Sequence, residues 1–195
     1  MKLKDLANVK TGLVISRKKS KLEQNAIATY KLLTLNNVSD DGIICDDSFE
    51  EFFSNEELDK HYFTEVGDVL LRLSQPFTSI YIDDLHENLL IPSYFAVIKV
   101  NSDKLLPQFL SWYLNTSYIK HELERAHSGS RILSTNQKAI NHLPISLIPI
   151  EKQKAIINLY NLHQREKLLL NKLIKEKEIL FHGITQKLLG GFHND

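Results

Sequence analysis

The C-terminal part of the sequence constrains the fold most strongly. Between Glu151 and Leu189 the chain has no proline, and Gly183 is its only glycine. Leu, Ile, Lys, Glu and Gln dominate this stretch, and all of them except Ile are strong helix formers. The run predicts one continuous helix about 58 Å long, at 1.5 Å per residue. An isolated helix is only marginally stable in water, so this one should pack against a partner.

The expected partner surface is a line of apolar residues along that helix. Most of its members are three, four or seven residues apart, the spacing that places side chains on one helix face. Glu166, Glu176 and Lys177 interrupt a strict heptad, so we expect an imperfect coiled coil that dimerises. The alternative is a helix packed wholly on its own domain, although a small domain is shorter than this helix. The expected dimerisation residues are Ile156, Leu159, Leu162, Leu169, Leu173, Leu180, Ile184 and Leu188.

The residues before the helix predict a β-rich domain with short helices. Aromatic and β-branched runs bounded by turn residues are typical of strands. Pro107 suits the first position of a helix, and Ser134 with Gln137 has the spacing of a capping box. We therefore expect an α+β fold with a domain over residues 1–150 and a helical arm over residues 151–195. The expected strands cover 30–35, 69–73 and 94–100, and the expected short helices cover 107–114, 118–125 and a stretch ending near Asn141.

Composition limits the class of protein and its compartment. Hydrophobic residues make up 43% and charged residues 25%, which are ordinary values for a folded globular chain. The single cysteine, Cys45, can form no internal disulfide, which fits a reducing cytosol. The sequence has no apolar run long enough for a bilayer, and its start lacks the apolar core of a signal peptide. We expect a cytoplasmic protein with no membrane partner.

The net charge is zero, but the charges are unevenly distributed. Residues 1–31 hold eight Lys and Arg against two acids, residues 32–98 two against fourteen, and residues 99–195 fourteen against eight. This segregation could place a basic face opposite an acidic one, as a protein that meets phosphate on one side requires. Uneven charge along a chain is also common without such a purpose, and both interpretations stay open.

Catalytic motifs are scarce in this sequence. The dinucleotide fingerprint, the Walker A sequence and the Asn-Pro-Pro-aromatic motif of amino-methylating DNA methyltransferases are all absent. The sequence also lacks any Asp, Glu or Gln two residues before a lysine, the usual metal-dependent nuclease pattern, and its eight histidines are scattered. The sequence therefore predicts a protein that is not an enzyme and holds neither a cofactor nor a metal.

Basic residues near the N-terminus are candidate DNA contacts. Arg17, Lys18, Lys19 and Lys21 follow the strand-like segment 13–15. Lysine and arginine supply most of the sequence-independent affinity for DNA, so this run could straddle phosphates. A solvated face with no such role is the alternative.

Two further groups could read bases or touch the groove. Arg72 interrupts an apolar run and is followed by Ser74 and Gln75, whose side chains can hydrogen-bond to base edges. Arg72 could equally pair with a nearby acid. The second group, Ser130 and Arg131, combines a hydroxyl and an arginine in a glycine-containing loop, which could also be a simple connection.

Several segments, in order, carry a resemblance to a known family. They are residues 2–12, 67–70, 106–115 and 129–134, followed by Leu143-Pro144 and the stretch from Ile148 to Ile156, where a proline precedes the long helix. Together these segments resemble the target-recognition domain and spacer helix of the specificity (S) subunit of type I restriction-modification enzymes.

The resemblance implies a non-catalytic role. S subunits bind double-stranded DNA and recruit adenine-N6 methyltransferase (M) subunits, and in the full complex also the restriction (R) subunits. Each recognition domain reads one half of a split target, and the spacer helices set the gap. A typical S subunit has two recognition domains, whereas this chain has one.

The single copy leaves several functions open. The chain resembles a half-subunit, which could form a homodimer, pair with another half, or be an inactive remnant. Two rivals from other classes are an enzyme and a helical protein adaptor that does not bind specific DNA.

Overall fold

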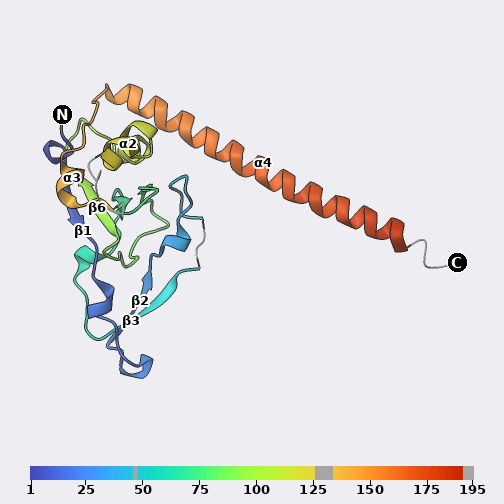
Figure 1. The fold of residues 1–195 in the computed structure, drawn as a ribbon, viewed down its shortest axis with the longest axis horizontal. Coiled ribbons are helices and arrows are strands. Elements are labelled where there is room, and N and C mark those ends of the chain that lie inside the picture. The colour runs from blue at the N-terminus through green and yellow to red at the C-terminus, as the bar shows by residue number, and fades with distance from the viewer. Residues whose placement is uncertain (46–47, 126–133, 191–195) are drawn as a thin grey trace. The chain divides into compact units, whose positions relative to one another are not determined.

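The computed structural model describes residues 1–45, 48–125 and 134–190. The chain divides into two compact units, residues 1–154 and the chain from Ala155 onward. The first unit combines strands and short helices, and the second is the greater part of one long helix (Figure 1). The fold class is α+β, as the sequence predicts. None of the helices in the described ranges combines the length and apolarity needed to cross a membrane.

A four-stranded antiparallel sheet forms the centre of the first unit. Its strands are β1 (Ala7–Thr11), β4 (Val69–Arg72), β5 (Ser79–Tyr81) and β6 (Phe95–Val100), in the order β1-β6-β4-β5. The first three residues of β4 and the first four of β6 are buried. Both central strands are therefore almost continuously apolar, as strands covered on both faces are. The structure confirms the two strands predicted at these positions.

A second, two-stranded sheet pairs β2 (Ala28–Leu32) with β3 (Glu50–Ser54). The predicted strand over 30–35 is displaced, because the chain leaves the sheet after Leu32. The Asn37 side chain accepts hydrogen bonds from the backbone N–H and the hydroxyl of Thr34, both at 2.8 Å. These bonds start a 3-10 turn over Leu35–Asn37, which ends the strand.

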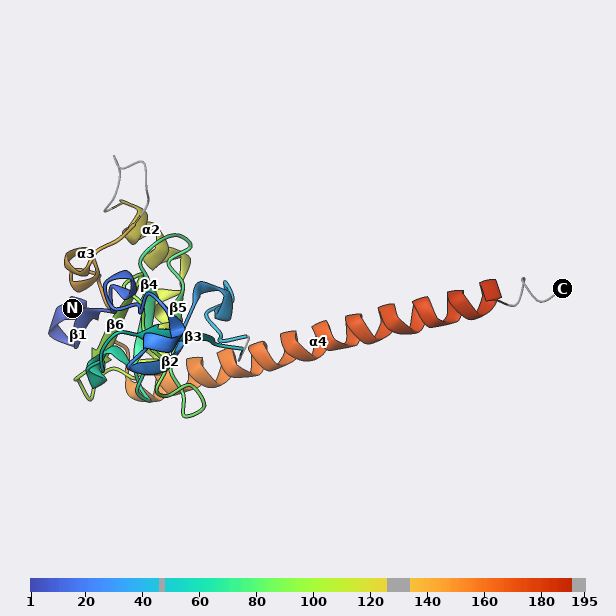
Figure 2. The same ribbon diagram turned by 90° about the horizontal axis from the view of Figure 1, so that it is seen from below.

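Three short helices pack on the first unit. They are α1 (Pro107–Leu114), α2 (Ser117–Arg125) and α3 (Gln137–Asn141), close to the predicted ranges. Figure 2 labels α2 and α3. Helix α1 packs on β4 and β5 and α3 on β1. The residue after α1, Asn115, holds the Ser79 backbone: its Oδ1 accepts from the N–H at 2.9 Å and its Nδ2 donates to the carbonyl at 2.8 Å.

The cap of α3 differs from the prediction. Asn136, not Ser134, caps this helix, with its Oδ1 accepting from the Ala139 N–H at 3.0 Å. Gln137 does not complete a capping box, because its side-chain amide donates to the Val9 carbonyl on β1. The amide thus ties the helix to the sheet.

A buried apolar cluster covers the sheet face opposite α1. Its members come from β4, β5, β6 and from loops, and include Leu33, Leu70, Ile80, Phe95 and Val97. Tyr94 packs against this cluster and donates its hydroxyl to the Leu33 carbonyl at 3.2 Å. Burial raises the pKa of Tyr94 to about 12.

The long helix, α4, covers Ile150–Gly190, one residue more at each end than predicted. It begins directly after Pro149, whose carbonyl accepts hydrogen bonds from the N–H groups of Lys152 and Gln153. Gln153 is fully buried. Its Oε1 accepts from the Leu106 N–H at 2.9 Å, and its Nε2 donates to the carbonyls of Lys104 and Ile148, both at 2.8 Å. This side chain anchors the first turn of α4.

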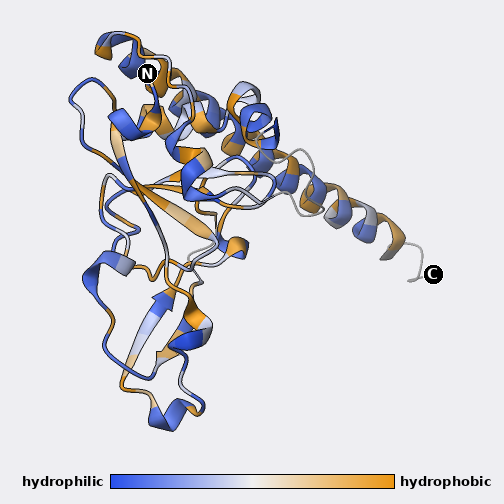
Figure 3. Ribbon diagram, turned by 60° about the vertical axis from the view of Figure 1, so that its left-hand side comes forward, coloured by the Kyte–Doolittle hydropathy of each residue, from blue (hydrophilic) through white to orange (hydrophobic). Residues whose placement is uncertain are grey.

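From Ala155 onward, α4 exposes most of its apolar side chains. Figure 3 shows hydrophobic residues recurring along the helix. Ile156 differs from the other seven expected dimerisation residues, because it is half-buried in the single chain. Those seven, Leu159, Leu162, Leu169, Leu173, Leu180, Ile184 and Leu188, are 50–69% exposed.

Candidate nucleic-acid interface

The turn between β4 and β5 presents three of the predicted base contacts on a rigid support. Arg72 ends β4, and its backbone N–H donates to the Thr78 carbonyl at 2.9 Å. Phe77 adopts a positive φ of 52° and is 1% exposed, so its ring fixes the turn from inside. Residues held by a sheet and a buried anchor are well placed to keep a defined geometry against a ligand.

Arg72 is half-buried, and its Nε donates to the Ser74 hydroxyl at 3.1 Å. Among the described residues it forms no ion pair, so the structure gives no support to the alternative in which an acid neutralises it. Its guanidinium can still donate through the terminal nitrogens, the groups that bind guanine O6 and N7. Ser74 orients the arginine and could itself reach a base edge.

Gln75 is exposed and linked to α2. Its Nε2 donates to Oε1 of Glu124 at 3.1 Å, and the other oxygen of Glu124 lies 3.1 Å from Nδ1 of His121. A glutamine amide can bind adenine, and a carboxylate can accept from cytosine N4. Glu124 was not predicted as a site residue, since only the fold brings it to Gln75. No local sequence pattern marks it.

The same turn meets both ends of the segment that carries Ser130 and Arg131. Helix α2 ends at Arg125, one residue after Glu124, and Ser134 forms an isolated β-bridge with Ser74. The Thr135 N–H donates to the Leu73 carbonyl at 2.6 Å. Ser130 and Arg131 themselves lie outside the described residues. The structure therefore joins the flanks of the second predicted group to the first group.

Two buried hydroxyls near this turn lack hydrogen-bond partners within the part of the chain that the structure describes. They belong to Thr78 and Thr135, whose backbones bond to Arg72 and Leu73 respectively. Buried polar atoms are almost always hydrogen-bonded in folded proteins. Both hydroxyls are buried beneath the turn and are not exposed to a ligand.

One lysine of the N-terminal basic run forms an ion pair with an acidic residue. Arg17 ends a 3-10 turn that begins at Ile15, the last residue of the segment expected to be strand-like, and Lys19 forms an isolated β-bridge with Ser54 at the end of β3. Lys18 Nζ lies 2.5 Å from Oε1 of Glu56, and the two side chains are 35% and 50% exposed. On the paired strands Lys31 stands opposite Glu51. At these two places, folding brings together opposite charges that are far apart in the sequence.

Arg17, Lys19 and Lys21 remain exposed. They belong to a different part of the unit from the arginine turn, since the run is tied to the two-stranded sheet. Within the described ranges, no hydrogen bond or ion pair joins the run to Arg72, Ser74 or Gln75. The predicted phosphate contacts and base contacts are therefore two separate groups.

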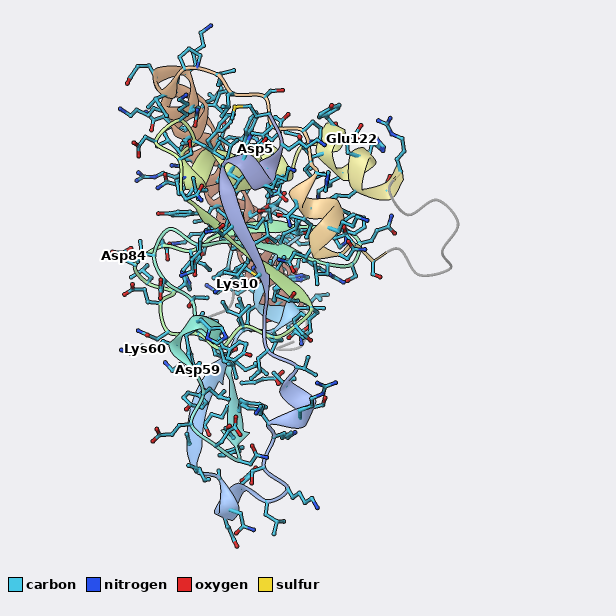
Figure 4. The ribbon with its side chains drawn as sticks, turned by 90° about the vertical axis from the view of Figure 1, so that its left-hand side faces the viewer. Asp5, Lys10, Asp59, Lys60, Asp84 and Glu122 are labelled. Atoms are coloured by element: carbon cyan, nitrogen blue, oxygen red, sulfur yellow. The ribbon has the colours of Figure 1, made fainter. Side chains whose placement is uncertain are left out.

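Lys10 is a basic residue that lies outside the predicted contacts. It is exposed on β1, where Figure 4 labels it. It lies opposite Val97 of β6, which pairs in turn with Leu70 of β4. Side chains alternate along a strand, so Lys10 and Arg72 share one face of the sheet. The alternation of buried Val9 with exposed Lys10 was the available signal, but strand β1 was not predicted.

Among the described residues, no group of three or more His, Cys, Asp and Glu side chains could hold a metal ion. The arrangement offers hydrogen-bond donors and acceptors of the kind that read base edges. Such groups can bind a nucleic acid and orient it.

Comparison with known proteins gives a consistent result. The sequence model of the family described as "Type I restriction modification DNA specificity domain" matches residues 1–179. No curated protein sequence matches the chain significantly.

Two solved structures share the fold. One belongs to a study of complex assembly and conformational transition of the type I R-M system, with a TM-score of 0.65, 15% identity and 87% of this chain covered. The other is the HsdS subunit from Thermoanaerobacter tengcongensis, with a TM-score of 0.64, 16% identity and 89% of this chain covered. This chain spans 43% of each of those chains.

Proposed function

Because this chain belongs to the type I restriction modification DNA specificity domain family, we propose that it is a DNA-recognition subunit that performs no chemistry itself. It reads one half of a bipartite double-stranded target in the cytoplasm and recruits an adenine-N6 methyltransferase (M) subunit. In a full complex the restriction (R) subunits would join. The observation that carries the proposal is the polar turn Arg72–Gln75, held on the sheet with unused donors.

The proposal includes a division of labour within the chain. Residues 1–150 recognise DNA, with Arg72, Ser74, Gln75, Ser130 and Arg131 at base edges or groove. The basic run at residues 17–21 supplies phosphate contacts, and the arm over residues 151–195 pairs two copies. Two solved relatives are about twice as long as this chain, so two copies would supply a comparable length.

The experiment that tests the proposal expresses the chain with its M partner and maps methylated adenines by sequencing. Two identical recognition domains related by a two-fold axis should direct methylation to an interrupted palindrome. The pure chain should bind DNA weakly, and the M subunit should make binding tight and specific. Tight specific binding by the chain alone, or an asymmetric methylated site with no second half-subunit present, would contradict the proposal.

A protein adaptor without specific DNA binding is the second candidate. The neutral net charge and the pairing of Lys18 with Glu56 favour it, since both weaken attraction to phosphate. DNA binding that weakens steeply with added salt would exclude the adaptor. An inactive remnant would fail to direct methylation at all.

A further inference from the structure

Helix α4 carries an 11-residue sequence repeat that extends beyond the heptad-like stripe. Three successive repeats begin at Ala155, Glu166 and Lys177, and they have apolar residues at equivalent positions. Leu162, Leu173 and Ile184 illustrate one such position. Eleven residues are close to three helical turns, so equivalent residues stay on nearly the same face along the whole helix.

The broad apolar face of this repeat is unoccupied in the single chain. Leu159, Leu162, Leu169, Leu173, Leu180 and Ile184 lie on it, and each is at least 50% exposed. Only two charged residues, Glu166 and Lys177, stand in the middle of this face, at the first position of the second and third repeats. They are separated by about 16 Å along the helix, too far to pair within one chain.

We propose that two copies pair antiparallel through α4 in one register, centred between Asn171 and Lys172, with Glu166 of each copy against Lys177 of the other. This inference rests on the proposed pairing of two copies and adds its direction and register. A two-fold axis at this centre maps the face onto itself. Ala155 then faces Leu188 of the second copy, Leu159 faces Ile184, and Leu170 faces Leu173.

The apolar face is complementary to itself, and a second copy of the chain is therefore the partner that would cover it. In this register most apolar positions of the face meet apolar positions, Leu180 meets His163, and the two charges that interrupt the face meet opposite charges. A parallel, in-register pair would set Glu166 against Glu166 and Lys177 against Lys177, which is repulsive. Charged or polar residues within a helix interface set register and orientation more than they add stability.

The local surroundings of the two charges leave them available for this pairing. Within its own helix Glu166 meets His163, whose Nδ1 lies 4.0 Å from its Oε2, and the two side chains are 71% and 67% exposed. Because this contact is long and exposed, an ion pair between Glu166 and Lys177 of the second copy would replace it. Lys177 is exposed in the single chain.

Cysteine crosslinking of the full chain tests the register directly, in a Cys45→Ser background that removes the native thiol. Positions 159 and 184 lie about 37 Å apart in one helix, so no disulfide can join them within a chain. The L159C/I184C double variant should oxidise to a covalent dimer. Each single variant alone should not, whereas an equimolar mixture of the two single variants should.

The possible failures are distinguishable. Crosslinking of L159C to itself would show a parallel pair and overturn the inference. A dimer in sedimentation whose L159C/I184C variant does not crosslink would overturn the register but leave the proposed pairing intact. A monomer at micromolar concentration, alone and with M present, would overturn both the register and the proposed pairing.

Charge exchange provides an independent test. Glu166→Lys or Lys177→Glu alone should raise the dimer dissociation constant at least about tenfold, because each creates two like-charge contacts per dimer. The double exchange E166K/K177E should restore it, as should mixing the two single variants. Lys175→Glu makes the same charge change on the opposite face and serves as the matched control. Equal effects of Lys175→Glu and Lys177→Glu would overturn the inference.

Discussion

Gln153 offers the sharpest test of how the first unit holds the start of α4. Its fully buried side-chain amide accepts from the Leu106 N–H and donates to the carbonyls of Lys104 and Ile148, at 2.8 to 2.9 Å. Leu106 is the N-cap residue of α1. One side chain therefore connects the beginning of α1, the segment before it and the chain entering α4.

Replacing Gln153 with alanine would remove all three hydrogen bonds. It would leave the Leu106 N–H without this acceptor, and a buried donor that loses its partner costs about 1–3 kcal/mol. The two carbonyls add less, because each can keep another donor or gain a water. We expect a total loss of about 3 kcal/mol in the free energy of unfolding, a large part of the stability of an ordinary domain.

Urea unfolding of the full chain measures this loss. The transition midpoint of Gln153→Ala should fall while the slope stays unchanged, since the same surface is exposed on unfolding. Lys154→Ala, the next residue, is the matched control: its side chain is 57% exposed and pairs with an exposed Glu151, so we expect a change within about 0.5 kcal/mol. If Gln153→Ala behaves like this control, the hydrogen-bond argument is refuted.

Three further predictions concern recognition and pH. Arg72→Ala or Gln75→Ala should cost about 1–3 kcal/mol on the specific site and little on random DNA, measured by competition binding with the M subunit present; equal losses on both would make them phosphate contacts. Lys19→Ala should weaken all DNA alike and reduce the slope of log affinity against log salt by about one, while an unchanged slope would leave the run a solvated face. Tyr94, with its pKa raised to about 12, loses its proton more readily when unfolded. The parent should therefore lose up to about 2 kcal/mol of stability relative to Tyr94→Phe between pH 10 and pH 12, whereas parallel pH profiles would contradict this.

The sequence alone determined those elements whose pattern is local. The run from Glu151 to Leu189 is recognisable as a helix because it is rich in strong helix formers and contains no proline. The structure extends this helix by only one residue at each end. Strands β4 and β6 and helix α1 were predictable for the same reason, since apolar runs bounded by Gly67, Pro92 and Pro107 mark them. The family resemblance could also be recognised from the sequence, because its motifs occur in order along the chain.

Only the tertiary structure decided which residues from distant segments meet. Glu124 reaches Gln75, Ser134 bridges to Ser74, and Glu56 lies against Lys18, each across 38 to 60 positions of chain. The cap of α3 changed for the same reason, because Gln137 found the Val9 carbonyl of β1 as a partner. Local propensity carries no information about such contacts. They depend on how strands pair and how helices cover them, and the pairing of Lys18 with Glu56 could not be read from the charge distribution along the sequence.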